Sequence, residues 1–334
     1  MYDPLSDLLQ NIKKRGGFVN AHAHLDRSYS LTPQDMSEIV RKPLVEKWRL
    51  VDNYKSEMTE EAYYQKFCYA LKKQSEFGVQ AVISFVDVDP VVGLRAVRAA
   101  YKAKTFASEL GVRFFIASQT LKGIVSNRSR KVLEQCLTEG YLDILGSLPK
   151  ADSDPERHLD TILAIARAAH LPVHAHVDQN NTATEKETEL LARKTIQFGH
   201  EGSVTAVHSI SLASHPKRYR KKVYGLAKDA GMGFITCPTA WLDHPRSETV
   251  APFHNALTPV EELISEGLLV ALGTDNIHDI YKPYCRGDME TELRVMLEGC
   301  KVYDPRVLLD ICTTNGFSVI KKGGSFLPPT LDLV

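Results

Sequence analysis

The sequence lacks paired cysteines, a net charge and any long apolar run. Its 6 cysteines are scattered without a C-x-x-C pair, which favours reduced core thiols over a disulfide framework or a cysteine zinc site. The 41 Lys and Arg residues balance 41 Asp and Glu residues, so no long-range field attracts nucleic acid or an acidic membrane surface. No window offers about 18 uncharged apolar residues, and the first residues carry no signal-peptide run. These absences predict a cytoplasmic protein that binds neither nucleic acid nor a membrane.

What remains is the composition of an ordinary globular protein, with 43% hydrophobic and 25% charged residues. This excludes a disordered, collagenous or coiled-coil chain. A length of 334 residues suits two average domains or one α/β barrel. Because no Gly-, Ser- or Pro-rich stretch supplies a linker, we expect one domain over residues 1–334.

Eight short runs, rich in β-branched and aromatic residues and bounded by Gly, Pro or Asp, predict buried strands. They are Gly17–His22, Val79–Val86, Val112–Ala117, Leu142–Ser147, Pro172–Val177, Val204–His208, Gly233–Thr236 and Leu268–Gly273. From the second run on they recur about every 30 residues with helical patterns between them, which is the period of a (β/α)8 TIM barrel. The longer first connection indicates an insertion. We expect a barrel core at about residues 17–322, with a closing helix at Asp304–Lys321 and a tail at residues 323–334.

Histidines gather where these strands end, which is where a barrel carries its active site. Strand alternation places His22 and His24 on one side of the first strand, facing the barrel axis, and the fifth strand repeats the pattern with His174 and His176. The sixth strand ends at His208, and Asp275 follows the eighth. Imidazoles and one carboxylate around an open position are typical of a catalytic metal site that activates water for hydrolysis.

These motifs resemble the amidohydrolase superfamily, in the branch of bacterial cytosine deaminase and N-isopropylammelide isopropylaminohydrolase. The matching segments occur in family order, as His22-Ala-His24, His176-Val-Asp-Gln179, Val-His208-Ser and Gly-Thr-Asp275-Asn. The resemblance implies one Zn or Fe ion held by His22, His24, His176 and Asp275. His174 is the alternative ligand on the fifth strand.

The resemblance also implies roles for other residues. His208 would orient and polarise the attacking water, and Asp275 would accept its proton. The residues implied to contact substrate or to hold the site are Gln119, Asn276, Arg27 and Tyr281.

The sequence departs from the family pattern in three ways. Gln179 stands where the deaminase has a glutamate, and an amide cannot shuttle a proton, so cytosine is an unfavourable substrate and Asp178 or His174 would have to protonate the leaving nitrogen. Phe85 removes a polar group from the pocket wall. The accessory β-sandwich of relatives is expected to be missing, which leaves room for a homo-oligomer contact.

Two further alternatives concern the metal site and the activity. Lys150 follows the fourth strand, near the position where binuclear relatives carry a carboxylated lysine, so a two-metal site is the rival to a single ion. For the activity, we expect a hydrolase that deaminates or dealkylaminates a small nitrogen heterocycle. The alternatives are ring opening of a cyclic amide, as in imidazolonepropionase, and a non-catalytic binding protein of the same fold.

Overall fold

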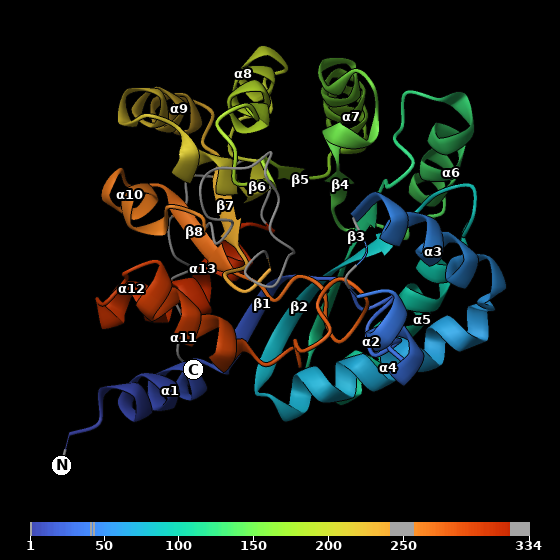
Figure 1. The fold of residues 1–334 in the computed structure, drawn as a ribbon, viewed down its shortest axis with the longest axis horizontal. Helices are drawn as coiled ribbons and strands as arrows, with labels where there is room; N and C mark the ends of the chain where they lie inside the picture. The colour runs from blue at the N-terminus through green and yellow to red at the C-terminus, as the bar shows by residue number, and fades with distance from the viewer. Residues whose placement is uncertain (1, 41, 43, 241–256, 321–334) are drawn as a thin grey trace.

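Eight parallel strands form a closed ring in the computed structural model, which describes residues 2–40, 42, 44–240 and 257–320 (Figure 1). The strands are β1 (Phe18–Ala23), β2 (Val79–Asp87), β3 (Arg113–Gln119), β4 (Leu145–Ser147), β5 (Val173–Val177), β6 (Val204–His208), β7 (Gly233–Thr236) and β8 (Leu269–Leu272). Neighbours pair in chain order within β1–β3 and within β4–β8. Single parallel bridges, Ala117 to Ile144 and Ala23 to Asp275, join the two sheets. The predicted (β/α)8 barrel is therefore confirmed.

Both junctions between the two sheets depend on a glycine. A Cβ on Gly146 of β4 would lie 1.6 Å from the carbonyl oxygen of Ser118 in β3, and a Cβ on Gly273 after β8 would lie 2.7 Å from Cβ of His22 in β1. Only a residue without a side chain permits these approaches. The second junction brings the end of β8 directly against a candidate metal ligand.

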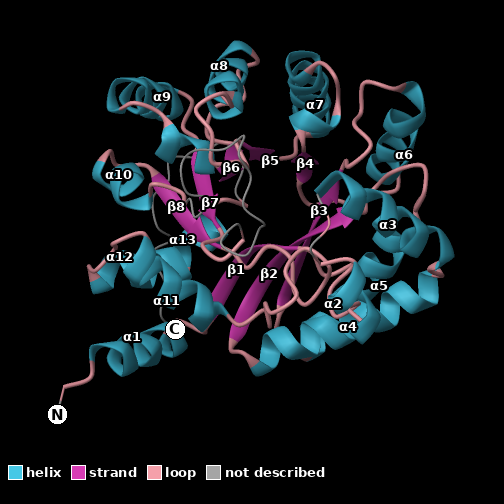
Figure 2. Ribbon diagram, in the orientation of Figure 1, coloured by secondary structure: helices cyan, strands magenta, loops and turns pink. Residues whose placement is uncertain are grey.

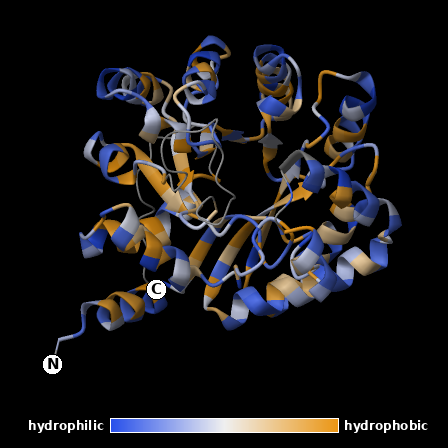
Figure 3. Ribbon diagram, viewed as in Figure 1, coloured by the Kyte–Doolittle hydropathy of each residue, from blue (hydrophilic) through white to orange (hydrophobic). Residues whose placement is uncertain are grey.

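Helices surround the barrel (Figure 2). They are α1 (Pro4–Lys14), α2 (Pro33–Glu38), α3 (Leu44–Glu57), α4 (Glu60–Glu76), α5 (Arg95–Glu109), α6 (Asn127–Thr138), α7 (Pro155–Ala169), α8 (Glu187–Gln197), α9 (Lys217–Asp229), α10 (Val260–Ser265), α11 (Met289–Gly299), α12 (Pro305–Cys312) and α13 (Thr314–Ser318), with short 3-10 turns at Pro149–Ala151 and Ile210–Ser214. The strands are mainly hydrophobic, whereas the helices mix hydrophobic and hydrophilic residues (Figure 3). This is the pattern of strands buried on both faces beneath amphipathic helices.

Local sequence sets where several helices begin. At α1, α2, α7 and α12 a capping residue precedes a proline in the first turn, and the capping side chains of Asp3, Thr32, Asp154 and Asp304 accept backbone N–H groups. The cap satisfies donors that the helix cannot, and proline fits the first turn because it needs no partner there.

The predicted strands lie within three residues of the observed ones at each end, but the predicted closing helix is wrong in its continuity. It is broken at Thr313, which has φ −131° and ψ −90°. The Thr313 hydroxyl donates to the carbonyl of Leu309, and the Asn315 side chain donates to the carbonyl of Val270 in β8. These bonds seat α13 against the barrel, where Gly316 lies on Val19 of β1.

The insertion after β1 carries α2 and α3. Asp52 of α3 pairs with Lys122, just beyond β3, and Lys55 pairs with Asp87 at the end of β2. The α3 helix therefore lies over the carboxyl ends of these strands, beside the site predicted from the sequence.

Some predictions lie beyond what the fold tests. No helix among the described residues is long and apolar enough to cross a membrane. The named strands of the described ranges all belong to the barrel, so no β-sandwich is found there. The predicted tail at residues 323–334 lies outside the described residues, and the single-domain assignment and the cytoplasmic location stay predictions.

Candidate active site

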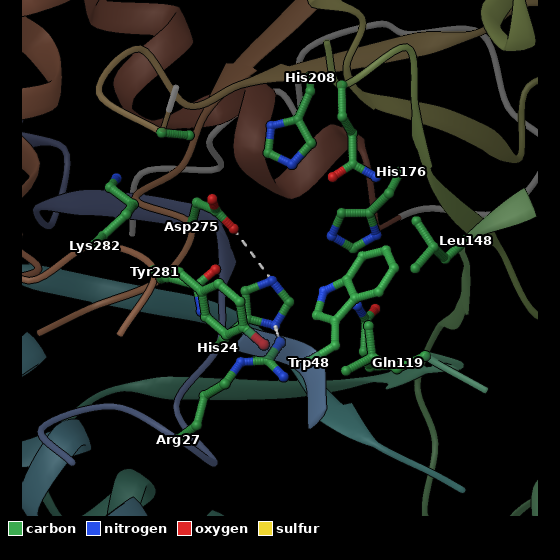
Figure 4. Close-up of a pocket in the computed structure, with 14 residues that line it drawn as sticks. His24, Arg27, Trp48, Gln119, Leu148, His176, His208, Asp275, Tyr281 and Lys282 are labelled. Carbon is green, nitrogen blue, oxygen red and sulfur yellow. Dashed lines mark hydrogen bonds and ion pairs between the residues drawn. The ribbon is translucent and has the colours of Figure 1, made fainter. Parts of the chain in front are cut away.

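A pocket of about 530 Å³, including its opening to solvent, lies at the carboxyl ends of the strands. The predicted site residues that line it are His24, Arg27, Gln119, His176, Gln179, His208, Asp275, Asn276 and Tyr281. These residues come from five strands, β1, β3, β5, β6 and β8, or from the loops after them, and converge on one space (Figure 4).

Four histidines and one aspartate lie together at the pocket, and all of them except His22 line it. We call His22, His24, His176, His208 and Asp275 the histidine cluster. Its ligand atoms fall into two groups, each within 4.8 Å, and His22 belongs to both. Oδ1 of Asp275 lies 3.3 Å from Nε2 of His22 and 3.2 Å from Nε2 of His24. The His22 ring centroid lies 4.7 Å from that of His176.

Backbone geometry directs two of these side chains inward. Asp275 has φ 61° and His208 has φ 75°, a left-handed conformation that is unusual outside glycine. The Asp275 amide donates to the carbonyl of His22, and the hydroxyl of Thr258 donates to the carbonyl of His208. Strained residues of this kind concentrate at functional sites.

Burial keeps His22, His24 and His176 neutral while Asp275 stays charged. Burial and the charge of Arg27 lower the pKa of His24 to about 3, and burial also lowers the pKa of His22 and His176. Burial alone would raise the pKa of Asp275, but hydrogen bonds from His22 and His24 hold it well below its usual value. Neutral imidazoles and an ionised carboxylate are the states that a metal ion requires.

Buried ring nitrogens without hydrogen-bond partners also indicate that the cluster can hold a metal ion. Both ring nitrogens of His176 and Nδ1 of His22 are buried without a partner. Buried polar groups are normally satisfied, and an exception calls for a missing ion or water. A divalent metal ion would be a partner for one nitrogen of each ring. The Phe85 ring of β2 packs against the cluster, with its centroid 4.6 Å from those of His22 and His176.

The two histidines of β5 are placed differently. His174 lies two residues earlier on the strand, and its Nε2 donates to the carbonyl of Val319 at 2.8 Å. It is absent from both metal-ligand groups that the described residues form. The geometry therefore favours His176 over His174 as the ligand.

Two other predicted residues lie outside the pocket. Asp178 accepts the backbone N–H groups of Glu187 and Thr188 at 2.7 and 3.0 Å, so its carboxylate caps α8. Lys150 pairs with Glu185, and its side chain is 43% exposed. The structure does not bring Lys150 to the histidines, which removes the geometric support for a two-metal site.

The predicted substrate contacts surround the cluster. Arg27 donates to Nδ1 of His24 at 2.5 Å and to both carboxylate oxygens of Asp87. Asn276 donates to Asp279 at 2.5 Å. Oε1 of Gln119 and the hydroxyl of Tyr281 are buried without a partner, so an acceptor and a hydroxyl remain for a ligand.

Sequence reasoning missed part of the lining, namely Trp48, Leu121, Leu148, Ala240 and Lys282. Lys282 is saturated, because its ammonium donates to Thr239, to the carbonyl of Thr274 and to Glu292. Its position directly after Tyr281, a predicted site residue, could have indicated from the sequence that Lys282 lies at the pocket. Trp48 had no such signal, since it comes from the insertion.

Comparisons with known proteins agree with this geometry. The model of the amidohydrolase family matches residues 16–326. The chain belongs to this family. A relative from Haemophilus influenzae, of no described function, is 42% identical over 260 residues, which cover 76% of this amidohydrolase and 93% of the relative.

Two characterised relatives place the amidohydrolase in the predicted branch. N-isopropylammelide isopropyl amidohydrolase of Pseudomonas sp. strain ADP is 27% identical over 82% of this chain, which spans 65% of that protein. The crystal structure of 5-methylcytosine deaminase from Klebsiella pneumoniae with 5-fluorocytosine superimposes with a TM-score of 0.83 at 26% identity, covering 91% of this chain and 74% of that one. The resemblance read from the motifs is confirmed.

Proposed function

We propose that this amidohydrolase is a mononuclear metal-dependent enzyme that deaminates or dealkylaminates a small nitrogen heterocycle. The family and its relatives support hydrolysis of carbon–nitrogen bonds other than peptide bonds. His22 shares one group of close ligand atoms with His24 and Asp275 and a second group with His176 and His208. The observation that carries the proposal is the resulting position of His22, His24, His176 and Asp275 beside one pocket.

The donor set suits zinc or iron, held by those four residues. When bound, the ion polarises water and the carbon that is attacked. The remaining chemistry belongs to the side chains.

Asp275 has the position and charge to accept the proton of the attacking water. It is ionised, and it is the one carboxylate among the described residues that line the pocket. His208 lies across the cluster, with its ring centroid 5.4 Å from that of His22, where it can stabilise the charge that develops in the transition state. Gln119, Asn276, Arg27 and Tyr281 hold the ring of the substrate.

The leaving nitrogen needs a proton that Gln179 cannot provide. Asp178 is engaged with the backbone of α8, and His174 with the carbonyl of Val319. We therefore assign both transfers to Asp275, which takes the proton from water and returns it to the departing ammonia or amine.

The test screens zinc-loaded protein against aminated pyrimidines, triazines, imidazoles and pterins for release of ammonia or amine. Asp275→Ala should lower turnover by at least about 10³-fold, because it removes the proton acceptor and a metal ligand together, while circular dichroism shows an intact barrel. Residual activity within tenfold of wild type would contradict the assignment.

Product analysis separates ring opening from deamination. Opening a cyclic amide adds water and releases nothing, whereas the proposed reaction releases one ammonia or amine for each turnover. Binding of heterocycles by metal-free protein, with no turnover when zinc is supplied, would instead indicate a binding protein.

A further inference from the structure

The α3 helix of the insertion brings an aromatic side chain to the pocket. Trp48 is half-buried and lines the same space as the histidine cluster. Figure 4 shows its indole directed into the pocket, between Tyr281 on one side and Leu148 on the other. No family motif identified in the sequence includes this residue.

Buried ion pairs fix α3 in place. Lys55, two helical turns after Trp48, donates to Asp89 at 2.5 Å and lies 3.0 Å from Asp87, and all three side chains are at most 3% exposed. We call these three residues the Lys55 cluster. Because Asp87 ends β2, the helix is tied to the rim of the barrel.

A second set of contacts holds the carboxyl end of α3. The Arg95 guanidinium of α5 donates to the carbonyls of Lys55 and Met58, each at 3.0 Å. These bonds satisfy carbonyls that a helix end leaves open. Trp48 is therefore presented by a helix with both ionic and backbone anchors, which is how a rigid recognition surface is built.

The lining has two chemically distinct parts. Trp48, Leu121 and Leu148 are apolar, whereas Arg27 and Gln119, with the loop after β8, supply polar groups. A flat conjugated ring matches this division, since its faces are apolar and its edge carries the hydrogen-bonding atoms. A puckered, saturated ring would not lie flat against the indole.

We propose that Trp48 is a specificity-determining residue that stacks on the substrate and selects flat, conjugated heterocycles over saturated cyclic amides. The inference deepens the proposed function and rests on its assignment of a heterocycle to this pocket. Lys55 acts as a positioning residue that keeps the indole at the pocket.

The test uses the two tryptophans of the chain, Trp48 and Trp241; the second lies outside the described residues. Trp241→Phe leaves Trp48 as the one indole emitter. A flat ring from the pyrimidine, triazine or imidazole classes should quench its fluorescence when it binds the zinc-loaded protein. The saturated 5,6-dihydrouracil should not.

Affinity and kinetics then separate stacking from simple packing. Trp48→Leu should weaken binding of the flat ring about 10- to 100-fold, the range of one aromatic stack, and raise KM more than it lowers kcat. Trp48→Phe should stay within about threefold of wild type, and so should Tyr101→Leu, which removes an exposed ring on α5.

Each outcome decides a separate point. The inference would be overturned if wild type and Trp48→Leu bound the flat ring with equal affinity. It would also be overturned if Trp48→Leu and Trp48→Phe lost equal affinity for that ring. Failure of every flat ring to bind would also overturn it. Quenching with stacking-dependent affinity, but no release of ammonia or amine, would refute the proposed function and leave the role of Trp48 standing.

Discussion

The histidine cluster and the Lys55 cluster are both buried at the carboxyl ends of the strands, yet they differ in how their polar atoms are satisfied. In the Lys55 cluster each charge meets an opposite one, and Asp89 also accepts the backbone N–H groups of Val91 and Val92. In the histidine cluster, both nitrogens of His176 lack a partner.

This difference indicates that the histidine cluster binds a ligand and that the Lys55 cluster stabilises the fold. A buried polar atom without a partner costs about 1–3 kcal/mol, so a fold keeps such atoms where a ligand will engage them. A saturated ion pair has no capacity left for a ligand. Substitutions in the two clusters should therefore have opposite consequences, on activity in one and on stability in the other.

The largest effect is expected from His176→Ala. The substitution removes a metal ligand. Because polarisation by the metal lowers the activation free energy by several kcal/mol, kcat/KM should fall at least about 10³-fold. The metal-free variant should unfold at the same urea concentration as metal-free wild type, or at a higher one, since the lost imidazole had no hydrogen bond. Zinc content by mass spectrometry should fall with activity.

His174→Ala is the matched control on the same strand. It breaks the bond to the carbonyl of Val319, so it should lower stability and leave one zinc per chain. If His174→Ala instead lost its zinc while His176→Ala kept it, His174 would be the metal ligand. Two zinc ions per chain in wild type would restore the binuclear site.

The next largest effect is expected from Lys55→Met. Burial alone would raise the pKa of Asp87, but the charges of Lys55 and Arg27 hold it below its usual value. Removing the ammonium leaves buried Asp89 without its ion pair to Lys55 and leaves Asp87 paired with Arg27. The free energy of unfolding should fall by about 3–5 kcal/mol, measured by urea denaturation. Lys102→Met, which breaks a pair with Glu60 whose lysine side chain is 62% exposed, should change stability little. Equal effects of the two variants would contradict the anchoring role of Lys55.

The barrel and the histidine cluster were accessible from the sequence for the same physical reason. Strands buried on both faces appear as continuous apolar runs, and period-2 alternation orients the pairs that include His22 and His24. Local patterns could therefore be read without knowing which elements touch.

The remaining features depend on contacts between distant segments or on backbone turns. Trp48 lines the pocket because the ion pair between Lys55 and Asp87 holds α3 against β2. No sequence pattern within α3 predicts that ion pair. Asp178 follows His176 by two residues, but its φ of 51° sends the carboxylate to α8. The closing helix breaks at Thr313 to seat α13 on the barrel.

Asp178 and Glu187 form a pair that is intermediate between the two clusters, because its hydrogen bonds are satisfied but its charges are not balanced. A substitution in this pair should give the smallest effect, on the free energy of unfolding. Each carboxylate accepts a backbone N–H group of the other residue, at 2.7 and 3.2 Å, but two like charges meet. Burial and the charge of Asp178 raise the pKa of Glu187 to about 7, above its unfolded value of about 4.3. The folded state thus binds this proton more tightly, and the resulting stability is full below pH 4.3 and lost as the pH rises through 7.

Glu187→Gln removes that titration and keeps an oxygen to accept the Asp178 N–H. After discounting for partial exposure, the variant should gain about 1 kcal/mol relative to wild type between pH 5 and pH 8, measured as the difference in unfolding free energy at the two pH values. Glu109→Gln, at an exposed position on α5, is the control and should show no such change. A difference that stayed constant across the range would mean that the buried carboxylates beside α8 are compensated as fully as those of the Lys55 cluster.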